Sequence, residues 1–554
     1  MNPLIYFDAF THIGPKANVH GAQPWSLDQL VVEMRHCSIS GALVSSISSV
    51  HYDPMLENRR LSGQLSKHDF LFPIWNAMPH WTGEFPPPEE LAGLMEQAGV
   101  RAVTLYPKTN GWGIQSKTSQ PLLEALERSQ TLTILSLPEI DVSGVENLLE
   151  NHPGLPLLLT GISWGCQRQI IPLLLRHQNL HIIFDHFQIN RGVEWLVEKG
   201  CENQLLFGSN ATDMSMGAHR AYIDYADIPD SARAKIASGN LIRLLKGIKP
   251  PREMINRDED EIMTEARQGK PLSALVLDFH AHILDEGLNG GGGSYTMFNG
   301  GPSGVHQLAK RLGIDGIGLM SWNGTVHVQA DEGNACVRAA LDALPADFSW
   351  GLATFDVARE SRKEIEQKLQ TIFKDPRFLG IKPYRTYGKF YDDPAYDAVW
   401  EFGNQRGLYA LFHPQRADLG EFDKPCSRYP NLTFVAAHCG GSYQAADAAI
   451  AKARQYPNFM IEITLTPVCM GIIDYLVQGA GADRVFFGSD QPMRDPRQQL
   501  GWVVYSRLSV EDKKKVLGLN AQALLERIKS SPAPAMAGRD CSTLDGDTLG
   551  ARTK

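Results

Sequence analysis

Short apolar runs alternate with amphipathic stretches along both halves of the chain. In the first half, Ser26-Leu-Asp-Gln29 is typical of a capping box, the pattern that begins a helix. Apolar side chains then follow at helical spacing, at Leu27, Leu30, Val31 and Met34. The next run, 41–46, predicts a buried strand, and 316–321 predicts one at the corresponding place in the second half. Repeated strand–helix–strand units predict parallel sheets with helices outside.

The two halves also resemble each other in sequence. Leu205-Leu-Phe-Gly-Ser-Asn210 corresponds to Val485-Phe-Phe-Gly-Ser-Asp490, 280 positions later, and Phe10 corresponds to His280, 270 positions later. Each copy spans about 250 residues, the size of one (β/α)₈ barrel. We therefore predict an α/β protein with two tandem (β/α)₈ TIM-type barrels. A doubly wound open sheet has the same alternation and is the alternative.

Proline and charge patterns divide the chain into four parts. A proline pair and a run of charged residues after position 248 predict a charged linker, partly helical. Small, polar and proline-rich residues near the end predict disorder. The predicted parts are a first barrel at 1–248, a linker at 249–274, a second barrel at 275–530 and a disordered tail at 531–554.

The amino-acid composition limits the classes of molecule that the protein is expected to bind. The 554 residues include 53 basic and 62 acidic side chains, a net charge of −9, and no basic run, which argues against binding to nucleic acid or an anionic membrane. No signal peptide or membrane-length apolar run is visible. The eight cysteines form no CxxC pair, so we expect reduced thiols and a cytoplasmic protein.

Candidate metal ligands gather at the ends of predicted strands in the second half. His280 and His282 lie two positions apart on one strand, so their side chains share a face. His413, His438 and Asp490 each follow another apolar strand, where it meets a loop rich in glycine or proline. A lone histidine at a strand end is usually a hydrogen-bonded polar residue. Several such groups at the same end of one barrel predict a transition-metal site, such as zinc.

These motifs resemble the amidohydrolase superfamily, in the branch that includes aminocarboxymuconate semialdehyde decarboxylase, aromatic acid decarboxylases and lactone hydrolases. The residues that carry the resemblance are Asp278-Phe-His-Ala-His282, Gly380-Ile-Lys-Pro383, Phe412-His-Pro414, Ala437-His-Cys-Gly-Gly441 and Phe487-Gly-Ser-Asp490. The resemblance covers nearly all of the second copy and implies a metal-dependent barrel with one divalent ion. Zinc is expected, with manganese as the alternative.

The resemblance also implies roles for single residues. His280, His282 and His413 would be metal ligands. Asp490 would be a ligand, a catalytic base, or both, and His438 would be a catalytic group that polarises the substrate. Lys382 could be a carboxylated lysine that bridges two metal ions, as in some members of the superfamily. We favour a cation that holds an anionic substrate, or a structural contact.

Further side chains after strand ends are candidates for substrate binding. Trp322, Arg385 and Arg494 occupy such positions, and the two arginines suit a substrate that bears a carboxylate. The loop 287–301 contains seven glycines. It is expected to be either a mobile lid or a plain insertion.

The first half departs from this pattern. Only His12 stands at a motif position, because Phe10 replaces the first histidine of the pair and Asn210 replaces the aspartate. We predict a barrel without metal ligands. A different site that uses His12, Asp185 and His186 is the alternative, although a buried, hydrogen-bonded histidine explains His186 as well.

The sequence therefore predicts a metal-dependent hydrolase in the second barrel, which cleaves an amide, ester or lactone bond with metal-activated water. A non-oxidative decarboxylase of a small carboxylic acid is the first alternative, and a catalytically silent scaffold or sensor is the second. The expected partner is a small anionic or cyclic molecule. The two barrels are expected to pair within the chain, and a homo-oligomer is a further alternative.

Overall fold

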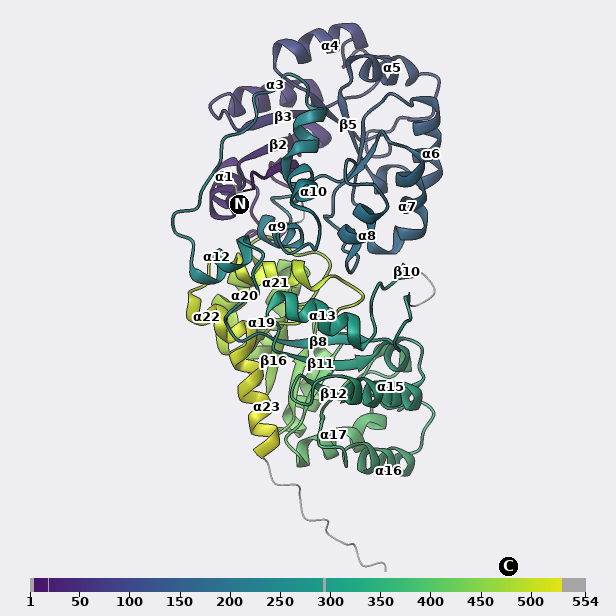
Figure 1. Cartoon of the computed structure of the whole chain (residues 1–554), viewed down its shortest axis with the longest axis vertical. Helices are drawn as coiled ribbons and strands as arrows, with labels where there is room; N and C mark the ends of the chain where they lie inside the picture. Colours follow the sequence, from purple (N-terminus) through teal and green to yellow (C-terminus); the bar gives the residue numbers. More distant parts are fainter. Residues whose placement is uncertain (1–3, 18, 292–294, 531–554) are drawn as a thin grey trace, which may run out of the picture.

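A computed structural model of the chain describes residues 4–17, 19–291 and 295–530. The predicted disordered tail lies outside these residues. Two parallel sheets lie one above the other along the long axis of the molecule, the N-terminal one in purple and blue and the C-terminal one in teal to yellow (Figure 1). This arrangement confirms the predicted α/β class and the two barrel domains.

The N-terminal sheet has seven strands in sequence order, all parallel. They are β1 (Phe7–Ile13), β2 (Gly41–Ser46), β3 (Leu71–Asn76), β4 (Ala102–Leu105), β5 (Leu132–Ser136), β6 (Leu157–Thr160) and β7 (Leu180–Ile182). The segment 205–211 takes the place of an eighth strand, because Leu205 pairs with Ile182 of β7 and Ala211 pairs with Thr11 of β1. The barrel is thereby closed.

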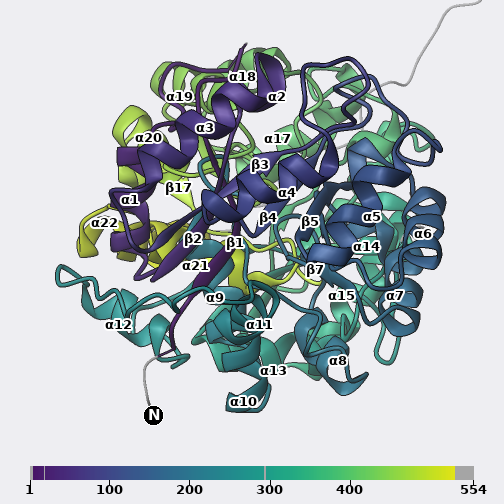
Figure 2. The same cartoon turned by 90° about the horizontal axis from the view of Figure 1, so that it is seen from above.

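Helices surround these strands, as the view from above shows (Figure 2). They are α1 (Leu27–His36), α2 (Ser48–His51), α3 (Pro54–Leu65), α4 (Pro88–Gln97), α5 (Gln120–Ser129), α6 (Val142–Asn151), α7 (Gln167–Arg176), α8 (Gly192–Glu198), α9 (Met216–Asp224), α10 (Asp230–Ala234) and α11 (Asn240–Leu244). The capping box predicted for α1 is confirmed: the Gln29 N–H donates to Ser26 Oγ at 3.2 Å, and the Ser26 N–H donates to Gln29 Oε1 at 3.0 Å.

The C-terminal sheet has eight parallel strands in sequence order. They are β8 (Leu277–Ile283), β11 (Gly316–Ser321), β12 (Ser349–Ala353), β13 (Phe378–Ile381), β14 (Tyr409–Phe412), β15 (Thr433–Ala436), β16 (Phe459–Glu462) and β17 (Val485–Phe486). The Phe279 N–H donates to the Phe487 carbonyl at 3.0 Å, and Ala281 pairs with Gln491, which closes this barrel between its last and first strands.

The C-terminal barrel has its own ring of helices. They are α13 (Pro302–Leu312), α14 (Trp322–Val326), α15 (Ala330–Ala343), α16 (Arg362–Ile372), α17 (Asp397–Gln405), α18 (Asp423–Arg428), α19 (Tyr443–Gln455), α20 (Ile472–Ala480), α21 (Pro496–Val504), α22 (Val510–Lys514) and α23 (Asn520–Ser530). In the loop after β8, the short strands β9 (Gly290–Gly291) and β10 (Tyr295–Thr296) pair antiparallel.

Large aromatic side chains fill the interior of the C-terminal barrel. Phe279 packs on Tyr409 with ring centroids 4.4 Å apart, and Trp350 Nε1 donates to the Tyr409 hydroxyl at 2.6 Å. Gly380 makes room for this group, because a Cβ there would lie 2.6 Å from Tyr409 Cζ. The core is therefore tightly packed below the carboxyl ends of the strands.

The two barrels pack on each other through the helix that follows the last strand segment of each. Helix α9 lies against α21 so closely that a Cβ on Gly501 would lie 2.5 Å from the Ala221 Cβ. Beside them, Arg497 pairs with Glu194 of the other barrel at 2.7 Å and with Asp495 at 2.5 Å, all fully or almost fully buried. Helix α12 (Glu261–Arg267), in the segment between the barrels, also contacts α9 and α21.

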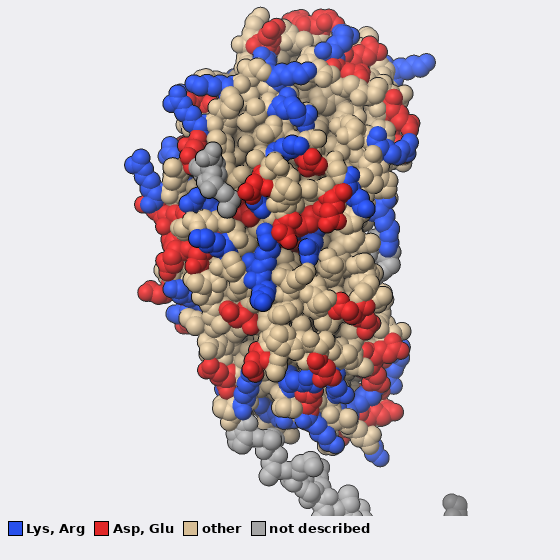
Figure 3. Space-filling model, in the orientation of Figure 1, with Lys and Arg blue, Asp and Glu red and all other residues tan. Residues whose placement is uncertain are grey.

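On the face drawn in Figure 3, blue and red side chains are mixed. The pattern agrees with the near balance of acidic and basic residues in the sequence. Within the described residues, no helix combines the length and apolar character needed to cross a bilayer.

Candidate active site

The candidate residues of the C-terminal barrel come from the carboxyl ends of its strands. His280 and His282 lie on β8. The others follow strand ends by one to four residues: Trp322 after β11, Lys382 after β13, His413 after β14, His438 after β15 and Asp490 after β17. Because parallel strands of a barrel end on the same side, this places the side chains around one mouth.

Three of the predicted ligands come together. His282 Nε2 lies 3.1 Å and His280 Nε2 lies 3.5 Å from Asp490 Oδ1, and the three donor atoms are within 4.8 Å of one another. All three side chains are buried, with exposed fractions of 1–3%. Two imidazole nitrogens and one carboxylate oxygen suit a divalent transition metal, so the donor set fits such an ion.

Glu462, at the end of β16, completes the surroundings of His280. Its Oε2 lies 2.9 Å from His280 Nδ1, and its Oε1 accepts the Thr464 N–H at 2.7 Å. Burial raises the pKa of Glu462 to about 7. Glu462 is not among the residues predicted from the sequence, although it is a single acidic residue in the apolar run 459–463. A carboxylate on the outer nitrogen of an imidazole fixes its tautomer and leaves Nε2 free to bind a metal.

His438 and His413 lie side by side at the same mouth. Their ring centroids are 4.7 Å apart, and the centroid of His438 is 5.1 Å from that of His280. His438 Nδ1 lies 2.6 Å from the Thr464 carbonyl, which can only accept, so the proton is on Nδ1 and Nε2 carries a lone pair. Two groups of three donors could hold an ion, namely His280–His282–Asp490 and His280–His438–Glu462. His413 packs near Tyr384 and is outside both groups. Its role as a ligand stays a prediction.

Two cations are buried beside the donors. Lys382 is fully buried, its Nζ lies 3.1 Å from His280 Nε2, and burial lowers its pKa to about 8. Arg494 forms an ion pair with Asp490 and donates to Thr466 Oγ1 at 2.5 Å. Burial alone would raise the pKa of Asp490, but Arg494 and the two histidines hold it well below its ordinary value.

The other substrate-binding candidates differ in position. The Trp322 side chain is buried and meets the His282 ring edge to face, with centroids 4.8 Å apart. Arg385 is exposed in the turn that follows Tyr384. The structure therefore places Trp322 in the wall of the mouth, and Arg385 at its outer surface.

The mouth of the N-terminal barrel has different chemistry. Lys16 Nζ lies 3.2 Å from His12 Nε2 and pairs with Asp213, whose Oδ1 is 3.3 Å from the same imidazole nitrogen. A lysine thus lies beside His12, as Lys382 lies beside His280, but His12 has no second imidazole like His282 at its motif position. His186 Nδ1 lies 3.1 Å from Asp185 Oδ2. Within the described part of the chain, both groups of three donors that could hold an ion belong to the C-terminal barrel.

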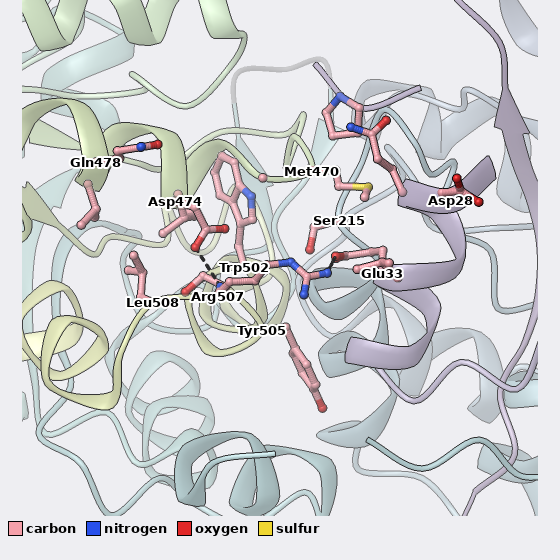
Figure 4. A pocket seen from close by; sticks show the side chains of 17 residues that line it. Asp28, Glu33, Ser215, Met470, Asp474, Gln478, Trp502, Tyr505, Arg507 and Leu508 are labelled. Atoms are coloured by element: carbon pink, nitrogen blue, oxygen red, sulfur yellow. Dashed lines mark hydrogen bonds and ion pairs between the residues drawn. The ribbon is translucent and has the colours of Figure 1, made fainter. Parts of the chain in front are cut away.

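A cavity of about 620 Å³ lies at the contact between the barrels (Figure 4). Its wall includes Glu33, Asp474 and Arg507; Arg507 Nη2 donates to Glu33 at 2.9 Å, and the Arg507 N–H donates to Asp474 at 2.8 Å. None of the predicted site residues lines it. The candidate chemistry therefore belongs to the strand ends.

Most of the second barrel is similar to a known protein family. Residues 278–527 match the family model described as amidohydrolase. The match agrees with the resemblance of this barrel's motifs to the amidohydrolase superfamily. The duplication and the branch of the superfamily stay predictions. No curated protein matches the chain.

Several solved structures resemble part of the chain at low sequence identity. The 5-carboxyvanillate decarboxylase of Sphingomonas paucimobilis is 14% identical, with a TM-score of 0.37, over 46% of this chain and 99% of its own. A dihydroxybenzoic acid decarboxylase of Polaromonas, with bound manganese and an inhibitor, is 17% identical, with a TM-score of 0.35, over 46% and 97%. An uncharacterised TIM-barrel protein of Bordetella bronchiseptica is 17% identical, with a TM-score of 0.38, over 46% and 99%.

Proposed function

We propose, from the amidohydrolase match of residues 278–527, that the C-terminal barrel is a metal-dependent enzyme that removes CO2 from a small carboxylic acid. The carrying observation is that two cations, Lys382 and Arg494, are buried at the mouth beside the three metal donors. Buried cations attract and hold an anion. In decarboxylation the reacting group is itself a carboxylate anion, so these cations could bind it directly. The reacting group of a neutral lactone or amide carries no negative charge.

His280, His282 and Asp490 would hold the metal ion, for which zinc and manganese are both suitable. When bound, a divalent ion supplies a Lewis acid that polarises the oxygen atoms of the acid. Lys382 and Arg494 would bind and orient the carboxylate, and Trp322 would pack on the apolar part of the substrate. The carbon that loses CO2 takes up one proton. Asp490 or His438 would pass it on, and each would first have to take up a proton from solvent, because Asp490 is ionised and the proton of neutral His438 is on Nδ1, toward Thr464.

The second candidate is the hydrolysis of an amide, ester or lactone. It is favoured by the carboxylate of Asp490, an acceptor 3.1 Å from His282 that could take a proton from water. His438 suits the predicted role of oxyanion donor less well, because its neutral form carries the proton on Nδ1, toward Thr464. It would need a second proton to donate to an oxyanion.

Metal content and product analysis of His280→Ala and His12→Ala test the proposal. We expect His280→Ala to lose the metal and the CO2 release from a panel of aromatic and unsaturated carboxylic acids, whereas His12→Ala keeps both. Equal metal loss from both variants would contradict the assignment to the second barrel. Ester, lactone or amide cleavage without CO2 release would establish the hydrolase, and a metal-loaded protein that acts on neither panel would establish the scaffold or sensor.

A further inference from the structure

The loop that follows β8 in the C-terminal barrel is held by the N-terminal barrel. The Thr296 N–H donates to Gln167 Oε1 at 2.9 Å, and Gln167 Nε2 donates to the Thr296 carbonyl at 3.2 Å. The Thr296 hydroxyl donates to the same oxygen. The side-chain amide of Gln167, which is 2% exposed, thus pairs with both backbone groups of Thr296 as a neighbouring strand would.

Two more residues of the N-terminal barrel bind the same loop two positions further on. Asn190 Nδ2 donates to the Phe298 carbonyl at 2.6 Å, and Trp195 of α8 stacks on the Phe298 ring with centroids 5.4 Å apart and planes at 14°. In Figure 1, β10 lies at the junction of the two barrels. Thr296 and Phe298 are therefore attached on the same side, toward the N-terminal barrel.

The residue between them belongs to an apolar cluster next to the candidate site. Met297 is fully buried and packs with Leu284 and Trp322, and Trp164 of the N-terminal barrel packs against this cluster. Trp322 in turn meets the ring of His282 edge to face at 4.8 Å. Contacts thus run continuously from the N-terminal barrel, through Met297 and Trp322, to a proposed metal ligand.

We propose that the N-terminal barrel positions the substrate-binding wall of the C-terminal barrel, with Gln167, Asn190 and Trp195 as the positioning residues and Met297 and Trp322 as the wall. The physical reason is the composition of the loop: seven of the residues 287–301 are glycine, and glycine loses the most backbone freedom when it becomes ordered. The loop has some order of its own, because β9 pairs with β10 and the Met297 N–H donates to the Asn289 carbonyl at 2.9 Å. The contacts from the N-terminal barrel add to these at Thr296 and Phe298. The part of this inference that concerns substrate binding rests on the proposed function.

Gln167→Ala tests the inference, with Gln120→Ala as its control. Gln120 also lies in the N-terminal barrel and also uses its side-chain amide in a hydrogen bond, to His152 at 3.0 Å, but it is remote from the loop. Backbone hydrogen exchange of the peptide that spans 296–301 is measured by mass spectrometry. We expect exchange about tenfold or more faster in Gln167→Ala, because its hydrogen bonds to the loop are removed, and wild-type exchange in Gln120→Ala.

The second readout is kinetic. For an acid that the wild type decarboxylates, Gln167→Ala should raise KM about fivefold or more, with the metal content unchanged, because the wall and not the metal site is displaced. Wild-type exchange and KM in Gln167→Ala would overturn the inference, and so would loss of the metal, which would show that the contact supports the metal site itself. The exchange measurement needs no substrate, so it decides about the loop even if the proposed reaction fails.

Trp195→Ala provides an independent variant if Gln167→Ala does not fold. It removes the stacking on Phe298, and Trp81→Ala, at a tryptophan that is 61% exposed on the same barrel, is its control. Faster exchange at 296–301 in Trp195→Ala alone supports the inference. Equal exchange in the two variants overturns it.

Discussion

Glu462→Gln should weaken metal binding without unfolding the barrel. In the wild type, Oε1 of Glu462 accepts the Thr464 N–H at 2.7 Å and also the Thr464 hydroxyl, while Oε2 faces His280 Nδ1 at 2.9 Å. A glutamine has the same shape but only one acceptor oxygen. That oxygen must face the Thr464 N–H, so the NH₂ group faces His280 Nδ1. Nδ1 then has to accept, and the ring proton moves to Nε2, the atom that is proposed to bind the metal.

The expected loss of metal affinity is about 10- to 100-fold, or about 1.4–2.7 kcal/mol, the usual effect of losing a carboxylate that orients a ligating histidine. Stability should not fall, because burial raises the pKa of Glu462 to about 7, and a neutral amide removes a buried charge above that pH.

Competition with a coloured chelator measures the affinity, and thermal unfolding of the metal-free protein measures the stability. Asp8→Asn is the matched control: Asp8 is a buried carboxyl of the N-terminal barrel whose pKa burial also raises to about 7, and its partners are Ser209 and the Phe10 N–H rather than an imidazole. Wild-type affinity in Glu462→Gln would refute either the ligand role of His280 or the tautomer argument.

Two further predictions concern stability. Asp8→Asn should become more stable relative to the wild type, by a few kcal/mol, as the pH rises from about 4 to about 7. Burial raises the pKa of Asp8 from 3.8 to about 7, so in this range the folded wild type keeps a proton that the unfolded chain has lost. The free energy of unfolding of the wild type therefore falls as the pH rises. Thermal unfolding at pH 5 and pH 8 measures the stability of both proteins, and an equal difference between them at the two pH values would contradict the prediction. Glu194→Ala should lower the free energy of unfolding by about 3 kcal/mol, because it leaves the buried Arg497 with one partner fewer. Its control is Glu146→Ala, which breaks an exposed pair with Arg176 and should lower the free energy of unfolding by less than about 1 kcal/mol. Equal effects of the two variants in chemical denaturation would contradict the importance of burial.

Local sequence patterns were sufficient to predict strands of both barrels and part of the candidate metal site. The strands 41–46 and 316–321 begin and end as predicted, because an apolar run bounded by turn residues determines its own burial. The His280/His282 pair lies on one strand face because the spacing of two residues enforces it. Asp490 joins this pair because it follows the strand segment that closes the barrel next to β8.

Contacts between residues far apart in the sequence could not be predicted in this way. Glu462 meets His280 across 182 positions, and Gln167 meets Thr296 across 129. Periodicity indicates which face of an element is buried, but not which side chain of another element will cover it. Residues that orient a ligand or a loop are of this kind, because their role depends on a partner that only the folded chain supplies.

The mouths of the two barrels share a backbone arrangement but differ in the side chains that it presents. Asp8 accepts the Ser209 N–H at 3.0 Å, and Asp278 accepts the Ser489 N–H at 2.9 Å, so each barrel ties its first strand to the segment after the last by the same pair. The next residues, Asn210 and Asp490, have the same left-handed backbone, with φ of 58° and 59°, a conformation that asparagine and aspartate tolerate better than most residues. The backbone therefore presents a side chain at the same place in both barrels. The side chains that surround this place differ. Asp490 lies beside two imidazoles, one of which contacts Lys382, whereas Asn210 lies beside a single imidazole, which contacts Lys16 and Asp213.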